Sequence, residues 1–467
     1  MSRRKAERQP DPKRPPVRFV EAVEPVAETA ITAAGVFAKA VALHLDGKIK
    51  DALAELNRAL ERNVMSAEIL SARGHILFEL EHYDEAASSY AKLIETSPEH
   101  ANAAFNLGVC QSKMGRWAQA ADAFRIAAEQ SPDWADACAG LGVCLLHSEQ
   151  AADALAAFDR CLNRKPGDPA AQFGKAVACQ LLGQNEEAMA LYRQAIERNP
   201  DSEEALVNLI SLGISTADTE MTREYSERLL TIRPHSQAAV EGLAHCAFAT
   251  EDYQAAAKLC AKLVESAPES FERRYNLGVA YQRSGRPEQA AKAYAEAVRL
   301  NDQSVQAHVN LGSVLHELGE HKGAFQAYER ALRLDANLPL VRYNLALLLE
   351  EQGATFEAEN LHEQLLEDHP EWEDAWFRLG YLRLRRSHFT GAVEAFERCV
   401  ERRKAWPQAQ VNLGIAYWRT GNLDAARDAF QAALESEPDS VDAMRGLAAI
   451  AIEQQDYGQA LELQAGL

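Results

Sequence analysis

Six asparagines recur in this 467-residue chain at one phase of a 34-residue spacing. Asparagine is a poor residue inside a helix, because its side chain competes for backbone hydrogen bonds. Something must therefore compensate for keeping it there, and a carboxamide can both donate and accept a hydrogen bond. The six residues are Asn106, Asn208, Asn276, Asn310, Asn344 and Asn412.

Eight cysteines could form metal sites or disulfides, but their spacing argues against both. None forms a C-x-x-C pair, and they fall at positions of the 34-residue spacing that suit core packing. We interpret them as small buried hydrophobic residues. This many free thiols favours a reducing compartment, so a cytoplasmic protein is expected.

His316, Glu317 and His321 resemble a zinc-protease helix only superficially. The two histidines are five residues apart and flank Gly319, where a helix is expected to end. That motif needs two histidines four residues apart on one helical face. The sequence also has no nucleophile elbow and no phosphate-binding glycine loop. We therefore predict no enzymatic activity, no metal site and no cofactor.

The asparagines are positioned by a repeat of 34 residues. Position 8 is small in twelve of thirteen units, position 20 is alanine in twelve, position 24 is mostly bulky, and proline occupies position 32 in eight. A period of this length indicates a solenoid in which each unit buries its apolar face against its neighbours. The units begin at Ala33, Ala67, Ala101, Ala135, Pro169, Glu203, Gln237, Phe271, Val305, Pro339, Glu373, Pro407 and Val441.

The third unit shows how this pattern forms two helices. The first helix is expected to end near Gly115, because glycine readily takes the left-handed conformation that terminates a helix. The second helix, residues 117–129, places Ala120 and Phe124 on one face. Pro132 ends it, because proline lacks an amide hydrogen and clashes with the preceding turn.

These features resemble the tetratricopeptide repeat family, whose signature has small residues at positions 8, 20 and 27, an aromatic residue near 24 and proline at 32. The resemblance implies an all-α fold, a right-handed α-solenoid of about 13 consecutive helix-turn-helix units over residues 32–467. In the unit at 203–236, Ile210 and Thr222 replace the small residue and the alanine. We expect a local irregularity or a hinge there.

The resemblance also implies a role for the asparagines, which occupy position 6 of the first helix. In superhelical members such as O-linked N-acetylglucosamine transferase and nuclear import receptors, an asparagine ladder on the inner wall holds the backbone of an extended peptide. The strongest run here is Asn276, Asn310 and Asn344, and aromatic neighbours would supply binding pockets. The alternative is that the asparagines bridge neighbouring repeats and touch no ligand. The neighbours are Tyr275, Tyr343, Phe377 and Tyr381.

A second candidate surface is a cluster of arginines among aromatic side chains. In an acidic chain it could hold a carboxylate, a phosphate or the C-terminal end of a partner. The alternative is that half of these arginines pair with Glu394, Glu397 or Glu401 on the following helix. The cluster contains Arg378, Arg383, Arg385 and Arg386, beside Trp376, Tyr381, Trp406 and Trp418.

Charge is distributed unevenly along the chain. Residues 1–31 are basic and proline-rich, a composition that cannot bury enough apolar surface to fold, so a disordered arm is expected. The net charge is −20, and residues 1–20 contribute seven basic and two acidic side chains, which leaves −25 for the remainder. Such a surface repels phosphate backbones, so a neutral or basic peptide is the expected partner and nucleic acid is not. No transmembrane stretch is present in the sequence.

The sequence thus predicts a non-catalytic scaffold or adaptor that binds an extended peptide or protein segment in the concave groove of a repeat superhelix. Two alternatives remain open. One is that the chain presents substrates within a glycosyltransferase or protease assembly, and the other is that it self-associates through its C-terminal end. The last unit lacks the clearly polar capping helix that terminal repeats normally need.

Overall fold

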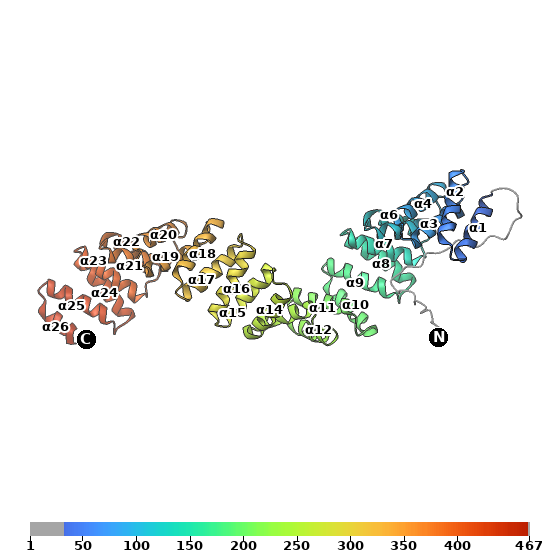
Figure 1. The fold of residues 1–467 in the computed structure, drawn as a ribbon. Helices are drawn as coiled ribbons and strands as arrows, with labels where there is room; N and C mark the ends of the chain where they lie inside the picture. The colour runs from blue at the N-terminus through green and yellow to red at the C-terminus, as the bar shows by residue number, and fades with distance from the viewer. Residues whose placement is uncertain (1–31, 466–467) are drawn as a thin grey trace, which may run out of the picture. The chain divides into compact units, whose positions relative to one another are not determined.

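The computed structural model describes residues 32–465, and these residues form 26 α-helices and no strand (Figure 1). The prediction of an all-α repeat fold is thereby confirmed. The basic arm at 1–31 lies outside the described residues. Within the described range, no helix combines the length and the apolar character that a membrane span requires.

Each repeat consists of a first and a second helix, of 13 and 14 residues in most units. The first helices are α1 (Ala33–Leu45), α3 (Ala67–Glu79), α5 (Ala101–Lys113), α7 (Ala135–His147), α9 (Pro169–Leu181), α11 (Glu203–Ser215), α13 (Gln237–Ala249), α15 (Phe271–Arg283), α17 (Val305–Glu317), α19 (Pro339–Glu351), α21 (Glu373–Arg385), α23 (Pro407–Arg419) and α25 (Val441–Glu453). The second helices are α2 (Ile49–Glu61), α4 (Tyr83–Thr96), α6 (Trp117–Gln130), α8 (Ala151–Arg164), α10 (Asn185–Arg198), α12 (Thr219–Ile232), α14 (Tyr253–Ser266), α16 (Pro287–Leu300), α18 (His321–Leu334), α20 (Thr355–Asp368), α22 (Phe389–Arg402), α24 (Leu423–Ser436) and α26 (Tyr457–Ala465).

Within each compact unit, helices that follow one another along the chain pack together, as α5 does with α6 and α6 with α7. First helices also contact the first helix of the next repeat, as α5 does with α7, α21 with α23 and α23 with α25. This consecutive packing is the α-solenoid arrangement that the repeat predicts. Where consecutive first helices touch, as α21, α23 and α25 do, their exposed faces form a surface that continues from one repeat to the next.

The turn between the two helices of a repeat has the same backbone conformation throughout. Position 15 has a positive φ in all thirteen repeats, from 56° at Ala217 to 82° at Gly421. Glycine takes this conformation without strain, as it does at Gly115 (φ 71°). Six repeats instead place a residue with a side chain there, at a cost of about 1–2 kcal/mol each. They are Glu81, Glu149, Ala217, Glu251, Ser387 and Gln455.

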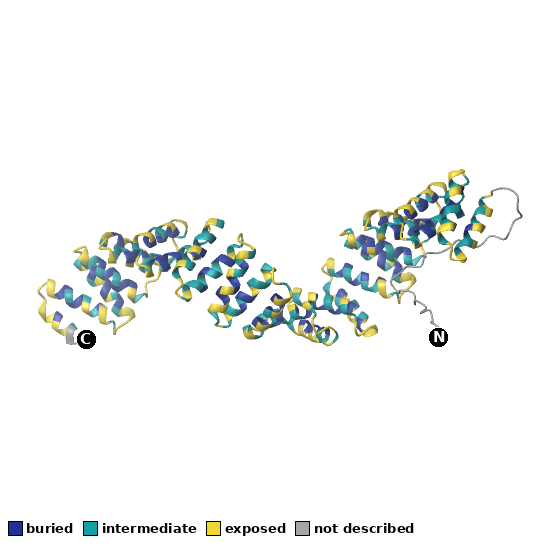
Figure 2. Ribbon diagram, viewed as in Figure 1, coloured by how far each residue is buried: buried dark blue, intermediate teal, exposed yellow. Residues whose placement is uncertain are grey.

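The core of each repeat forms where the side chain at position 24 inserts between the two helices. Tyr294 is fully buried, and a Cβ added at Gly278 would lie 2.6 Å from its ring. Phe158 is equally buried against Gly142, and Ala290 at position 20 is also fully buried. Buried residues accordingly lie on the facing sides of paired helices, and exposed residues gather at the turns (Figure 2). The small residues at positions 8 and 20 thus allow close helix packing, as predicted.

The described residues divide into two compact units, one extending to Leu243 and one beginning at Ala244. The repeat at 203–236, which lies in the first unit, has helices as long as those of other repeats. Thr222 and Ser226 are fully buried in it, in place of the usual alanine and aromatic residue. A hinge in this repeat remains a prediction.

Candidate functional site

The six asparagines fall into two groups according to the residue sixteen positions earlier, which is position 24 of the preceding repeat. A tyrosine stands there for four of them, and every tyrosine at position 24 is followed by such an asparagine. Asn276 and Asn412 instead follow Cys260 and Phe396, which carry no hydroxyl group. The four tyrosine–asparagine pairs are Tyr90 with Asn106, Tyr192 with Asn208, Tyr294 with Asn310, and Tyr328 with Asn344.

The tyrosine hydroxyl accounts for the asparagine in the pairs where a contact is seen. The Nδ2 atom of Asn310 donates to the hydroxyl oxygen of Tyr294 at 3.4 Å and to that of Tyr275 at 3.0 Å. Burial raises the pKa of Tyr328 to about 12, although hydrogen bonds with Ser313 and Asn344 partly lower it. A buried phenol generally needs a polar partner, and the carboxamide of the next repeat supplies one.

In the first pair both residues are buried, but no hydrogen bond joins the Tyr90 hydroxyl to Asn106. Burial raises the pKa of Tyr90, and the neighbouring Asn106 carboxamide lowers it in part. Asn106 itself is only 4% exposed, so its carboxamide is not available to a ligand. Asn208 is half-buried, and the Tyr192 hydroxyl donates instead to the Oε1 atom of Gln180 at 2.9 Å.

Where position 24 is phenylalanine, the next repeat usually has glycine at position 6. A Cβ at Gly140 would lie 2.8 Å from the Phe124 ring, and one at Gly446 would lie 2.4 Å from the Phe430 ring. The phenylalanine ring therefore reaches the first helix of the next repeat and leaves no room for a side chain. In most repeats position 6 thus matches position 24 of the preceding repeat, with Asn276 and Asn412 as exceptions. Sequence reasoning missed this coupling although the residue pairs are visible in the sequence.

The aromatic residues at position 5 also belong to contacts within the fold. Tyr343 stacks on Trp372 with ring centroids 5.5 Å apart, and Phe377 stacks on Trp406 at 4.7 Å. Tyr275 stacks on Phe271 at 5.9 Å and accepts the hydrogen bond from Asn310. All three rings are half-buried. Their stacking contacts hold them in place, and only part of each ring is exposed to solvent.

Four of the residues predicted to bind a ligand meet in one hollow of about 560 Å³ in the C-terminal unit. Phe377, Arg378 and Tyr381 contribute from α21, and Asn412 contributes from α23. Tyr381 is 38% exposed, whereas Asn412 is half-buried. The part of the lining that comes from the link between α24 and α25 and from the first turn of α25 is acidic, with Glu437, Asp439 and Asp442. The structure does not bring Asn276, Asn310 or Asn344 into this hollow.

The Arg378 side chain lies at the α21 wall of the hollow. Its Nη1 atom is 3.5 Å from the Oε2 atom of Glu350, and its side chain is 41% exposed. Burial raises the pKa of Tyr343, and Arg378 lowers it by hydrogen bonding and by its charge. Arg378 therefore retains exposed surface beside Phe377 and Tyr381.

Arg383 and Arg386 pair with glutamates of the preceding repeat and not with Glu394, Glu397 or Glu401 on the following helix, whereas Arg385 lies over the Tyr381 ring. Arg383 contacts Glu359 (Nε–Oε1 3.2 Å) and Glu363 (Nη2–Oε1 2.5 Å), and Arg386 also binds Glu359. Glu359 is 7% exposed, and a buried carboxylate is costly unless a cation pairs with it. Because Glu359 needs a cationic partner, the guanidinium groups of Arg383 and Arg386 on α21 lie toward α20.

His316 and His321 lie on two different helices, as the position of Gly319 between them predicted. Helix α17 ends at Glu317, Gly319 has a φ of 72°, and His321 begins α18, so the two histidines do not share a helix. His362 occupies position 24, is fully buried, and pairs with Glu350 at 2.9 Å. All eight cysteines are free and buried, which confirms their interpretation as core residues.

Comparison with known proteins identifies the repeat. A family model of the tetratricopeptide repeat matches residues 71–133, 111–169, 223–271, 275–339, 341–409 and 411–467, and a second tetratricopeptide repeat model matches 145–212. No curated protein matches the chain.

Several solved structures are similar to the chain at low sequence identity. YrrB, described as a TPR protein with an unusual peptide-binding site, is 21% identical over 40% of this chain and 97% of that chain, with a TM-score of 0.38. The Naa15/Naa10 complex bound to HypK-THB is 17% identical over 93% of this chain and 68% of that chain, with a TM-score of 0.39. A tetratricopeptide repeat protein from Parabacteroides merdae is 17% identical over 56% of this chain and 99% of that chain, with a TM-score of 0.39.

The family models cover well over half of the sequence. Repeats of this kind form extended surfaces through which scaffold proteins bind other proteins. The chain is a member of the tetratricopeptide repeat family.

Proposed function

We propose that this scaffold protein binds an extended, neutral or basic peptide segment along the first helices of its C-terminal unit. The observation that carries the proposal is the hollow lined by Phe377, Arg378, Tyr381 and Asn412. Its walls come from α21, α23 and the start of α25, which belong to three consecutive repeats. A surface that crosses three repeats suits an elongated ligand better than a compact one.

The charges around the hollow favour a basic side chain in the ligand. Glu437, Asp439 and Asp442 line one wall. Arg445 lies 3.9 Å from Asp442, at the long end of an ion pair, so this wall is only weakly neutralised. A ligand lysine or arginine would meet these carboxylates, while the exposed ring of Tyr381, beside the half-buried Phe377, would pack against its apolar neighbours.

The asparagines would contribute unequally to peptide binding. Asn276 is exposed and Asn412 lines the hollow, and neither follows a tyrosine. Asn310 uses Nδ2 for Tyr275 and Tyr294, so its Oδ1 atom is the one that would accept a ligand amide hydrogen. Of the asparagines in the proposed ladder, Asn276 and Asn412 are therefore the two whose carboxamides would both donate a hydrogen bond to a peptide and accept one from it.

The test uses the full chain and synthetic peptides that are rich in lysine and arginine, with acidic peptides of equal length for comparison. Basic peptides should bind, and the double variant Asn276→Ala/Asn412→Ala should lose about tenfold in affinity, since two hydrogen bonds contribute about 0.5–1.5 kcal/mol each. Asn360→Ala is the matched control, because Asn360 is half-buried on the second helix α20. Equal binding by the double variant and the control would refute the assignment.

Self-association is a second candidate function, favoured by the exposed apolar side chains of α26. Tyr457 is 62% exposed and Leu461 is 66% exposed. If this surface joins two copies, the mass measured by light scattering should rise with concentration, and Leu461→Glu should abolish the rise. A constant monomer mass for the unmodified chain would eliminate this candidate.

A further inference from the structure

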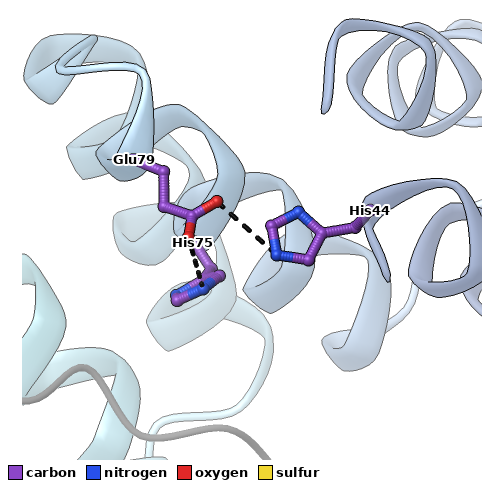
Figure 3. Close-up of side chains that lie close together, drawn as sticks. All are labelled: His44, His75 and Glu79. Carbon is purple, nitrogen blue, oxygen red and sulfur yellow. Dashed lines mark ion pairs between the residues drawn. The ribbon is translucent and has the colours of Figure 1, made fainter. Parts of the chain in front are cut away.

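Two histidines and a glutamate meet on neighbouring first helices of the N-terminal unit. His44 lies in the last turn of α1, and His75 and Glu79 are four residues apart on α3, so they share one face of that helix. Both imidazole rings approach the Glu79 carboxylate (Figure 3). The His44 Nε2 atom is 3.5 Å from Glu79 Oε2, and the His75 Nε2 atom is 3.8 Å from Glu79 Oε1.

These distances are close to those of a metal coordination sphere. One ligand atom from each residue lies within 4.8 Å of the other two. Zinc binds imidazole nitrogen and carboxylate oxygen at about 2.0–2.2 Å, so the ligand atoms of a tetrahedral site are about 3.4 Å apart. Small side-chain rotations would bring the three atoms to that spacing, with no change required in either helix.

We propose that His44, His75 and Glu79 bind one divalent transition-metal ion, with zinc as the best-matched ion. Two imidazoles and one carboxylate form a ligand set that zinc accepts, and such a set leaves a fourth coordination position for water or another donor. Among the described residues, this is the group of histidine, cysteine and acidic side chains whose ligand atoms are close enough to share an ion.

The site is accessible without being fully exposed. The side chains of His44, His75 and Glu79 are 22%, 14% and 39% exposed, so an ion can reach them from solvent. Both imidazoles also border a hollow of about 280 Å³, whose other walls include Phe37 and Ile76. A partly apolar surrounding of this kind strengthens the attraction between a cation and a carboxylate.

A bound ion would link α1 to α3, which already contact each other. Because the ligands come from the first helices of two consecutive repeats, the ion would join the first repeat to the second. Sequence reasoning missed the site because His44 is at position 12 of one repeat, whereas His75 and Glu79 are at positions 9 and 13 of the next. Only the packing of consecutive first helices makes these positions neighbours.

The second histidine pair in the chain provides a matched control. His316 lies 3.0 Å from the Oε2 atom of Glu351, and the Nδ1 atom of His321 lies 3.8 Å from the same oxygen. This group therefore has the same composition, but its contacts converge on one carboxylate oxygen across a helix boundary. The double variant His316→Ala/His321→Ala removes two histidines while leaving the proposed site intact.

The experiment titrates the chelator-treated full chain with Zn²⁺ by calorimetry, and with Co²⁺ by visible absorption. One equivalent should bind, and His75→Ala and Glu79→Gln should each weaken binding by more than roughly tenfold, since even residues that only orient ligands matter that much. The control variant should bind like the unmodified chain. Bound Co²⁺ should show the bands of nitrogen and oxygen ligation without the charge-transfer band of a thiolate.

Three results would overturn the proposal: no saturable binding, binding that both site variants retain, or a thiolate band that assigns the ion to cysteine. Far-UV circular dichroism of each variant establishes that its helices are intact. Since Glu79→Gln keeps the size and shape of the side chain, weak binding by that variant cannot be attributed to lost packing.

Discussion

At the scale of single residues, the asparagines of this chain have two different explanations. Asn310 and Asn344 meet tyrosine hydroxyls that the preceding repeat buries. Asn276 and Asn412 have no tyrosine at the corresponding position. A polar residue that is unfavourable in a helix is therefore retained for packing in some repeats and is available for binding in others.

This division predicts unequal effects on stability. Asn310→Ala should lower the free energy of unfolding by about 1 kcal/mol, because it removes hydrogen bonds to Tyr294 and Tyr275. Asn276→Ala should have little effect or a slightly stabilising one, since Asn276 is exposed and alanine is the better helix former. Chemical denaturation followed by circular dichroism measures both. Equal losses in the two variants would contradict the division.

A double-mutant cycle gives the coupling directly. Tyr294→Phe keeps the ring and removes the hydroxyl, so the effect of Asn310→Ala should be smaller in that background. The Tyr294 hydroxyl also donates to Gln282 at 2.8 Å, so the two side chains form part of a small network. Strictly additive losses would mean that Asn310 does not act through Tyr294.

Much of this residue-level picture could be predicted from the sequence, but the partners could not. The 34-residue phase correctly placed Gly278 and Ala290 in close helix contacts and the cysteines in the core. The resemblance predicts that the six asparagines form a ligand ladder, but four of them follow a tyrosine at position 24 of the preceding repeat. Which side chain lies behind position 6 depends on how successive repeats stack, and that information is three-dimensional.

At the scale of elements, the repeat depends on one turn conformation and one helix pairing. Position 15 is left-handed in every repeat, whether or not its residue is glycine. The arginines of α21 show a second constraint, because the buried Glu359 on α20 draws Arg383 and Arg386 toward the preceding repeat. The sequence indicated ion pairs with the following helix as one alternative for half of these arginines, and this alternative named the wrong helix because both neighbouring helices contain glutamates.

The shared turn predicts that some repeats can be stabilised by a single change. Glu251 has a φ of 58°, so Glu251→Gly should relieve about 1 kcal/mol of backbone strain and raise the thermal midpoint. The opposite change is Gly285→Ala at the equivalent position of the next repeat, where φ is 71° and no atom lies within 4 Å of the added Cβ. It should destabilise through backbone strain alone. Opposite signs in differential scanning calorimetry would support the argument, and equal signs would contradict it.

At the scale of the whole molecule, the chain combines a strongly acidic surface with a core that contains protonated thiols. Eight free cysteines are buried in the described residues. Burial raises the pKa of Cys110, Cys144 and Cys399 to about 12. The folded protein therefore holds these thiols protonated at pH values where an unfolded chain would release the protons.

This difference predicts alkaline instability. A thiol whose pKa rises from 9.0 to about 12 on folding contributes stability that is fully present below about pH 9 and is lost as the pH rises toward 12. The denaturation midpoint should therefore be constant near neutral pH and fall above pH 9. Measuring the midpoint across this range, with native thiol labelling near neutral pH as a check on burial, tests the expectation. A midpoint that stays constant into the alkaline range would show that the buried thiols are not responsible for stability there.

The central claim is that a peptide binds at the hollow formed by α21, α23 and α25, and photo-cross-linking tests it most directly. A benzophenone side chain would replace Tyr381, which lines the hollow, or Phe356, which is 57% exposed on the second helix α20. The account predicts that a bound basic peptide cross-links to position 381 and not to position 356. Cross-linking at 356 alone, or equally at both positions, would contradict it.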